Sequence, residues 1–198
     1  MNRNEYFYVF EAIIYGLALT EILTGLNRMI IFRKAIKVYW VHLALVFVYI
    51  ELLVSQYAWE FYMNTFDLID SAMTFLIFVV IFPISYYFGA YQIFPRNFEN
   101  VDFKEYFHSH RKAILTPAIV MVIALVNKSI FEVVSSKGIE YFSQFIFSLE
   151  AWYVWQQTFF VFAISYATFS KKHWPSEVLA VFGLIAQTCI MLVKFRTV

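Results

Sequence analysis

The sequence is poor in cysteine, in charged residues and in familiar catalytic motifs. Cys189 is its one cysteine, so a disulfide-stapled fold and a cysteine-based zinc site are both excluded. We find no HExxH pair, no glycine-rich phosphate loop and no nucleophile elbow. Hydrolases and nucleotide-binding enzymes that depend on those motifs find no support. An enzyme of another kind stays open, but it ranks behind transport and partner binding.

Apolar and aromatic residues take the place of the missing charges. Of the 198 residues, 62% are hydrophobic, 22% are aromatic and 15% are charged, and the mean hydropathy is +0.66. Soluble domains carry about 25% charged residues, so the composition is typical of an integral membrane protein. The net charge of +1 excludes neither a charged ligand nor a membrane surface, because the charges are clustered along the chain.

Six apolar stretches, separated by short charged connectors, fill nearly all of the chain. Each is long enough to cross about 30 Å of hydrocarbon as a helix. We place these spans at residues 7–27, 38–60, 71–94, 113–134, 142–169 and 177–195. The expected fold is therefore all-α, a single polytopic transmembrane helical bundle over residues 1–198. No small-residue cleavage site follows Glu5, so we expect the first span to be retained.

The third connector has a helical pattern of its own. Asp102 followed by Glu105 resembles a capping box, and aromatic residues recur after it at helical spacing. We expect a short amphipathic helix at the membrane interface. The alternative is that this segment only extends the fourth span into water. Gly138 is expected to cap the end of the fourth span, and Pro83 to bend the third.

Lysine and arginine are distributed unevenly between the two sides of the expected bundle. The side opposite the odd-numbered connectors has only Arg3, Lys137, Lys194 and Arg196. Cytoplasmic loops of membrane proteins carry the excess of positive charge. The pattern therefore predicts that both termini lie outside the cytoplasm. The ten basic residues of connectors one, three and five are Arg28, Arg33, Lys34, Lys37, Arg96, Lys104, Arg111, Lys112, Lys171 and Lys172.

Ionisable residues inside the expected spans are the first candidates for function. A charged group in hydrocarbon costs about 3 kcal/mol even on the mildest insertion scale, so these side chains should face the bundle, water or a partner. Glu51 lies near the centre of its span without a basic residue at its level, and it is our candidate protonatable group. The full set of polar-core or ion-pathway candidates is Glu21, Glu51, Asn127, Lys128, Glu150, Gln156 and Gln157.

Lys128 and Glu150 fall at similar depths on adjacent spans, which predicts an ion pair between them. Four further residues, Asn127, Glu132, Gln156 and Gln157, could complete a polar network around that pair. The alternative for all of these residues is a structural role, in which side-chain hydrogen bonds only hold the helices together.

Basic residues and histidines near the expected cytoplasmic face form a second set of candidates. For contact with anionic lipid headgroups or a protein partner we select Arg33, Lys34, His108, His110, Arg111 and Lys112. His42 and His173 fall at helix ends, where we expect solvated or headgroup-contacting rings. No pair of histidines lies within the spans, so we expect no metal, haem or other cofactor. Nothing beyond these charges indicates nucleic-acid binding.

The run Gly16–Leu26, the following basic turn, Tyr39-Trp-Val-His-Leu43 and the acidic segment from Asp102 to His110-Arg-Lys112 form an ordered set of motifs. In this order they resemble a group of small uncharacterised bacterial six-span integral membrane proteins. The similarity covers residues 8–115. Gln56-Tyr57-Ala58-Trp59 stands where the group has a tryptophan pair. The resemblance implies a bacterial inner-membrane location and a compact helical bundle, and it implies no chemistry.

Two functions from different classes follow from these observations. The first is a small transporter or channel with a buried acidic pathway for protons or cations, assembled as a homo-oligomer because six short spans leave little room for a private cavity. The alternative is a membrane-embedded sensor, anchor or effector subunit, for example of a stress or phage-defence system, that acts through lipid or a protein partner.

Overall fold

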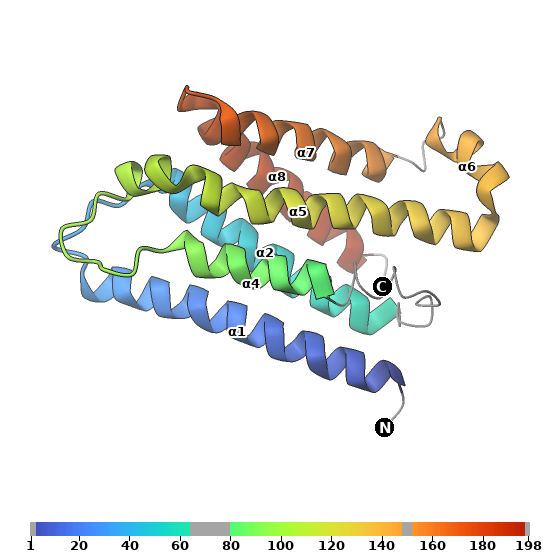
Figure 1. Cartoon of the computed structure of the whole chain (residues 1–198), viewed down its shortest axis with the longest axis horizontal. Helices are drawn as coiled ribbons and strands as arrows, with labels where there is room; N and C mark the ends of the chain where they lie inside the picture. Colours follow the sequence, from blue (N-terminus) through green and yellow to red (C-terminus); the bar gives the residue numbers. More distant parts are fainter. Residues whose placement is uncertain (1–2, 64–79, 148–151, 197–198) are drawn as a thin grey trace.

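The computed structural model describes residues 3–63, 80–147 and 152–196, and these segments are helical apart from short connectors. No β-strand forms within them; Lys37 and Asp102 form one isolated parallel bridge. The all-α class is confirmed for this part of the chain. Its helices are α1 (Arg3–Ile31), α2 (Trp40–Met63), α4 (Phe82–Ile93), α5 (Phe103–Lys137), α6 (Ile139–Ile146), α7 (Trp152–Phe169) and α8 (Trp174–Arg196), as Figure 1 shows.

Two helical segments, Glu5–Ile31 in α1 and Phe103–Asn127 in α5, are long and apolar enough to cross a membrane by length and composition. Shorter apolar segments cover Trp40–Ser55 in α2 and Trp174–Ala186 in α8. Helices of this kind also occur in soluble cores and as signal sequences. The two long apolar segments are therefore consistent with a membrane location, but they do not establish six membrane spans.

The fourth expected span differs from its prediction at its beginning. Helix α5 runs without interruption from Phe103 to Lys137, so the amphipathic segment extends the span and is not a separate interfacial helix. The physical reason is that no glycine or proline lies between Asp102 and Pro117 to end the helix. Pro117 itself lies inside α5.

The fifth expected span also differs from the structure, and the third is described only in part. In place of one helix over 142–169, α6 ends at Ile146 and α7 begins at Trp152. Of the third span the structure describes α4, while residues 71–79 lie outside the described segments. Pro83 lies in the first turn of α4, directly after the π-helical residues 80 and 81. The bend that we expected at Pro83 depends on residues 71–79, which lie outside the described segments, so it stays a prediction.

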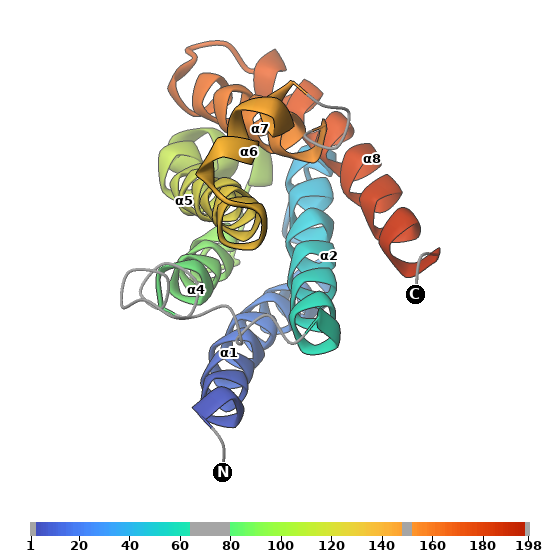
Figure 2. The ribbon, with the colours of Figure 1, turned by 90° about the vertical axis from the view of Figure 1, so that its right-hand side faces the viewer.

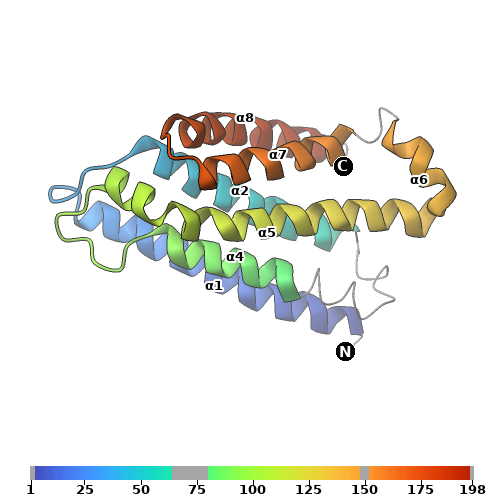
Figure 3. The same ribbon diagram turned by 45° about the horizontal axis from the view of Figure 1, so that its top comes forward.

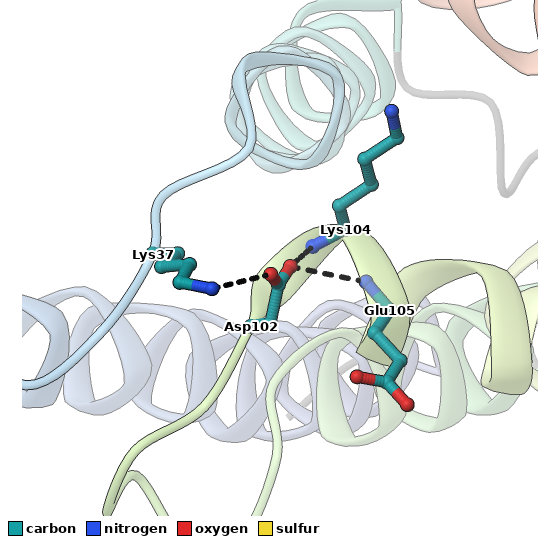
Figure 4. A network of polar contacts seen from close by, with 4 residues as sticks. All are labelled: Lys37, Asp102, Lys104 and Glu105. Carbon is teal, nitrogen blue, oxygen red and sulfur yellow. Dashed lines mark hydrogen bonds and ion pairs between the residues drawn. The ribbon is translucent and has the colours of Figure 1, made fainter.

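Both expected caps of α5 are confirmed. The Asp102 carboxylate accepts hydrogen bonds from the backbone N–H of Lys104 at 2.9 Å and of Glu105 at 3.3 Å (Figure 4). These bonds satisfy amide donors that have no partner inside the first turn. At the other end Gly138 has a φ of +84°, and its N–H donates to the Val134 carbonyl at 2.9 Å. Glycine adopts a positive φ without the strain that a side chain would add.

The long helices lie side by side and place three connectors together. Residues 32–39, 94–102 and 170–173, which join α1 to α2, α4 to α5 and α7 to α8, lie at the left end in both Figure 1 and Figure 3. The ten basic residues of the odd-numbered connectors lie in or next to these segments, so we call this end the basic end. Helix α1 begins and α8 ends at the opposite end.

Helix packing follows a closed order around the bundle. Helix α1 packs on α4, α4 on α5, α5 on α7, α7 on α8, and α8 on α2, which contacts α1 again (Figure 2). Close approach fixes two of these contacts. A Cβ atom at Gly25 would overlap the Phe94 ring, and one at Gly89 would overlap the Tyr49 side chain. The missing side chain at Gly25 therefore lets α1 pack against the Phe94 ring, and the missing side chain at Gly89 lets α4 pack against Tyr49 of α2.

Candidate functional site

The most buried carboxylate in the described segments is one that the sequence analysis did not select. Glu11 is 1% exposed and lies in α1 on the same face as Tyr15, Ala18 and Ile22, which are also buried. The spacing of these four positions follows one face of a helix. The helical spacing of these positions could have identified Glu11 as buried. We did not select Glu11 from the sequence because it lies near the beginning of the span, where a carboxylate is ordinarily solvated.

Four tyrosines, Tyr15, Tyr49, Tyr57 and Tyr86, form a cluster that continues from Glu11 toward the basic end. The Tyr86 ring lies 5.9 Å from the Tyr15 ring and 5.6 Å from the Tyr49 ring, and the Tyr15 and Tyr57 rings are 6.1 Å apart. All three pairs meet edge to face, the geometry that aromatic pairs prefer.

Two hydroxyls of this tyrosine cluster connect different helices. The Tyr86 hydroxyl donates to the Tyr49 carbonyl, and the Tyr49 hydroxyl donates to the Ile114 carbonyl at 3.4 Å. The first bond joins α4 to α2, and the second joins α2 to α5. The cluster therefore places polar atoms inside a core that is otherwise apolar.

The two predicted pathway carboxylates of α1 and α2 lie at the margin of the packed face. Glu51 is half-buried, and its Oε2 atom is inaccessible. Phe47, one turn before it, is exposed, and Ser55, one turn after it, is buried. Glu21 is also half-buried and lies between exposed Leu17 and buried Gly25. At about 1.5 Å per residue, both carboxylates lie about 15 Å from the basic end of their helices.

The polar network expected between the fourth and fifth spans is only partly described. The Asn127 amide donates to the Ile123 carbonyl of its own helix at 2.8 Å. Gln156 and Gln157 are half-buried on α7, which packs against α5. The side chains of Lys128 and Glu132, together with Glu150, lie outside the described residues, so the ion pair between Lys128 and Glu150 stays a prediction.

At the basic end, the first and third connectors are joined by backbone and side-chain contacts. The Lys37 N–H donates to the Val101 carbonyl at 2.9 Å, and the Phe103 N–H donates to the Lys37 carbonyl at 3.0 Å. The Lys37 ammonium lies 3.6 Å from the Asp102 carboxylate (Figure 4). The N–H bonds from Glu105 and Lys104, together with the Lys37 charge, lower the pKa of Asp102 below its usual value.

The fifth connector is held by two side chains that we had selected for headgroup contact. The Arg111 guanidinium donates to the carbonyls of Ser170 and Lys172, the second at 3.0 Å. Nδ1 of His108 lies 3.0 Å from Nδ1 of His173, with ring centroids 3.8 Å apart. We call these three side chains, Arg111, His108 and His173, the connector clasp. Both His108 and Arg111 are half-buried.

The other four headgroup candidates are exposed, namely Arg33, Lys34, His110 and Lys112. The His110 ring stacks on Tyr106 at 4.5 Å, and the Lys112 ammonium lies 5.8 Å from the centroid of the Phe169 ring. These side chains give the basic end an outward-facing positive charge. The clasp residues, by contrast, serve to position the fifth connector.

His42 corrects the expectation of a solvated histidine at a helix end. It is 0% exposed, and its ring lies 4.8 Å from that of Phe103 and 5.4 Å from that of Phe94. Neither ring nitrogen has a hydrogen-bond partner among the described residues. The third connector brings these aromatic rings over the first turn of α2, which explains why local sequence alone placed His42 at the surface.

Two surface hollows stand out in the described segments, which hold no cluster of metal ligands. No group of three histidine, cysteine, aspartate or glutamate side chains in these segments could hold a metal ion. One hollow lies at the turn after α1. The other, of about 480 Å³, lies between α4 and α5 and includes Gln92 and Lys112. Both are open grooves at the protein surface.

Comparison of the chain with known protein families, curated proteins and solved structures finds no match. Function is therefore argued from the residues and their geometry alone. The resemblance to small bacterial membrane proteins stays an expectation.

Proposed function

We propose that this chain is an integral membrane protein whose basic end lies on the cytoplasmic side and serves as a positively charged anchoring platform. The observation that carries the membrane assignment is the apolar outer surface. Along α7, exposed large side chains recur at helical spacing, and Phe159 and Phe162 are 67% and 70% exposed. Exposed apolar side chains also occur on α1, α2 and α8, among them Phe10, Phe47 and Phe182. Soluble monomers rarely expose contiguous apolar patches of this extent, whereas acyl chains cover them at no cost.

The gathering of basic residues at one end supports the orientation. The three connectors at that end are the ones that carry the positive excess, and the positive-inside rule assigns them to the cytoplasm. Contacts between the connectors keep their backbones in place, so Arg33, Lys34, His110 and Lys112 point outward from a fixed surface. Each such charge near an anionic leaflet contributes about 1 kcal/mol to association.

Thiol labelling tests this orientation directly, because Cys189 is the one native cysteine. In a Cys189→Ser background we would compare Lys34→Cys at the basic end with Glu140→Cys at the opposite end. A membrane-impermeant maleimide should label position 140 in intact spheroplasts and position 34 only after lysis. Recovery of the protein in the soluble fraction, or the opposite labelling pattern, would refute the proposal.

A second candidate function is a pathway for protons or cations, and Glu11 favours it. This 1% exposed carboxylate lies on the face of α1 that carries Tyr15, next in line to the tyrosine cluster. A buried ionisable group in a membrane helix is costly and commonly functional. Glu51 and Glu21 add carboxylates at mid-depth. Neither of the two surface hollows includes these carboxylates, and we propose that the pathway is completed between copies of the chain in a homo-oligomer.

Reconstituted vesicles with an internal pH dye test the pathway. Wild type should dissipate an imposed proton gradient, and both Glu11→Gln and Glu51→Gln should slow the flux. Glu140→Gln is the control, because Glu140 is exposed on α6. If wild type moves neither protons nor monovalent cations, or if only Glu140→Gln changes the flux, this candidate is wrong.

A further inference from the structure

The groove between α4 and α5 has a polar end and an apolar end. Gln92 and Lys112 line it toward the basic end, and Ser85 and Val120 line it at the deeper end. The two helices run in opposite directions along it. At about 1.5 Å per residue, the distance is about 10 Å from Gln92 to Ser85 and about 12 Å from Lys112 to Val120.

The deep end of this groove offers little to a polar ligand. The Ser85 hydroxyl donates to the Ile81 carbonyl of its own helix at 2.7 Å. Phe88, which is 51% exposed, and Pro117 form apolar walls between the two ends. A ligand that fits must therefore combine a polar head near Lys112 with an apolar tail beside Phe88 and Val120.

Lys112 supplies a charge that the described residues do not neutralise. Its neighbour Arg111 is committed to the connector clasp, whereas the ammonium of Lys112 contacts only the Phe169 ring within the described segments. An anionic head group is complementary to this charge. Pro117 has no N–H, so the Ala113 carbonyl beside Lys112 loses its helical donor and can accept a hydrogen bond from a head-group hydroxyl.

We propose that this groove binds one anionic phospholipid, with its phosphate at Lys112 and Gln92 and one acyl chain along Phe88, Pro117 and Val120. The inference rests on the proposed membrane location and adds a specific lipid site to the anchoring platform. The chain would then hold a defined lipid and not only a diffuse anionic layer.

Native mass spectrometry of the full-length protein tests the site, using particles of phosphatidylglycerol and phosphatidylcholine in equal amounts. We expect wild type to retain one phosphatidylglycerol after gentle delipidation. Lys112→Gln should reduce that retention about fivefold, the effect of one lysine at an anionic surface. Lys171→Gln removes an equal charge from the exposed fifth connector, outside the groove, and should leave retention unchanged.

A second variant separates charge from shape. Val120→Trp would fill the deep end of the groove without altering any charge, and it should also abolish the retained phosphatidylglycerol. Equal retention by wild type and Lys112→Gln, or equal losses with Lys112→Gln and Lys171→Gln, would overturn the lipid site. If the protein is found in membranes but retains no specific lipid, this inference is wrong and the proposed function stands. If the protein is absent from membranes, the proposed function is wrong as well.

Discussion

The bundle interior and the basic end satisfy their polar groups in different ways. Within the helices, hydroxyl and amide side chains bond to the carbonyl four residues earlier in their own helix, as in Ser85, Asn127 and Thr168. At the basic end, polar side chains reach other segments: Lys37 contacts Asp102, and Arg111 binds the fifth connector. The tyrosine cluster is the interior exception, since its hydroxyls bond between helices.

This difference indicates what holds each region together. A polar side chain that forms its hydrogen bond within its own helix does not require a partner on another helix. Contacts between helices in the interior therefore depend on apolar packing and on close approach at glycine. At the basic end, directional hydrogen bonds fix how the connectors lie relative to one another. Packing defects should therefore be most damaging in the interior, and loss of single polar contacts should have smaller, more local effects.

The largest effect is expected at Gly89. In Gly89→Ala the new Cβ would overlap the Tyr49 side chain, so either the buried Tyr49 ring must move from its place or α2 and α4 must separate. Overpacking of this kind costs about 1–3 kcal/mol in free energy of unfolding, which denaturant titration in detergent micelles would measure. Gly16→Ala is the matched control, since nothing lies within 4 Å of a Cβ there. Equal stability of the two variants would mean that the α2–α4 contact is not as tight as described.

A smaller loss is expected from the connector clasp. Arg111→Ala removes the hydrogen bonds to the Ser170 and Lys172 carbonyls, and bonds to a charged group contribute about 1.5 kcal/mol at the low end of their range. The effect should be concentrated in the fifth connector, as faster amide exchange around residues 170–173. Lys34→Ala, at an exposed position of the first connector, should leave that exchange unchanged. Uniform acceleration across α7 and α8 would contradict a local role.

Removing one hydroxyl from the tyrosine cluster should have a comparable or slightly smaller effect. Tyr86→Phe loses the bond to the Tyr49 carbonyl and should lower the free energy of unfolding by about 1 kcal/mol. Tyr87→Phe, at the next position, removes a half-buried hydroxyl for which the described residues give no such bond. If Tyr87→Phe destabilises the protein more than Tyr86→Phe does, the hydroxyl of Tyr86 does not hold α4 to α2.

The smallest effect is expected at Asp102, and it depends on pH. Its lowered pKa means that the folded state binds this proton less readily than the unfolded state does. Its contribution to stability is therefore present above the ordinary pKa of 3.8 and is lost as the pH falls below it. The protection of the amides in the first turn of α5, relative to their intrinsic exchange rates at the same pH, should fall in that range. Asp102→Asn keeps a capping oxygen but should remove this pH dependence, and a persistent dependence would assign it to another group.

Much of the helical framework follows from local sequence. Uninterrupted apolar residues predicted α1, α2 and α8, and Asp102 and Gly138 predicted the ends of α5 because capping is local chemistry. The division of the fifth expected span at Ile146 was not predicted, since its apolar residues continue past the break.

The sites were harder to predict, because burial depends on distant segments. His42 is covered by the third connector, about fifty residues later in the chain. Arg111 and Lys112 are adjacent and chemically alike, yet one turns toward the fifth connector and the other toward solvent. No local pattern separates those two outcomes.

The two backbone hydrogen bonds between Lys37 and the chain on either side of Asp102 couple the first and third connectors mechanically. A displacement of Arg33 or Lys34, caused by a bound head group or by another protein, would be transmitted to the beginning of α5 through these two hydrogen bonds, without rearrangement of the helical bundle. The two connectors should then open as one unit, so the amide protons of Lys37 and Phe103 should have equal protection against exchange once their intrinsic rates are taken into account.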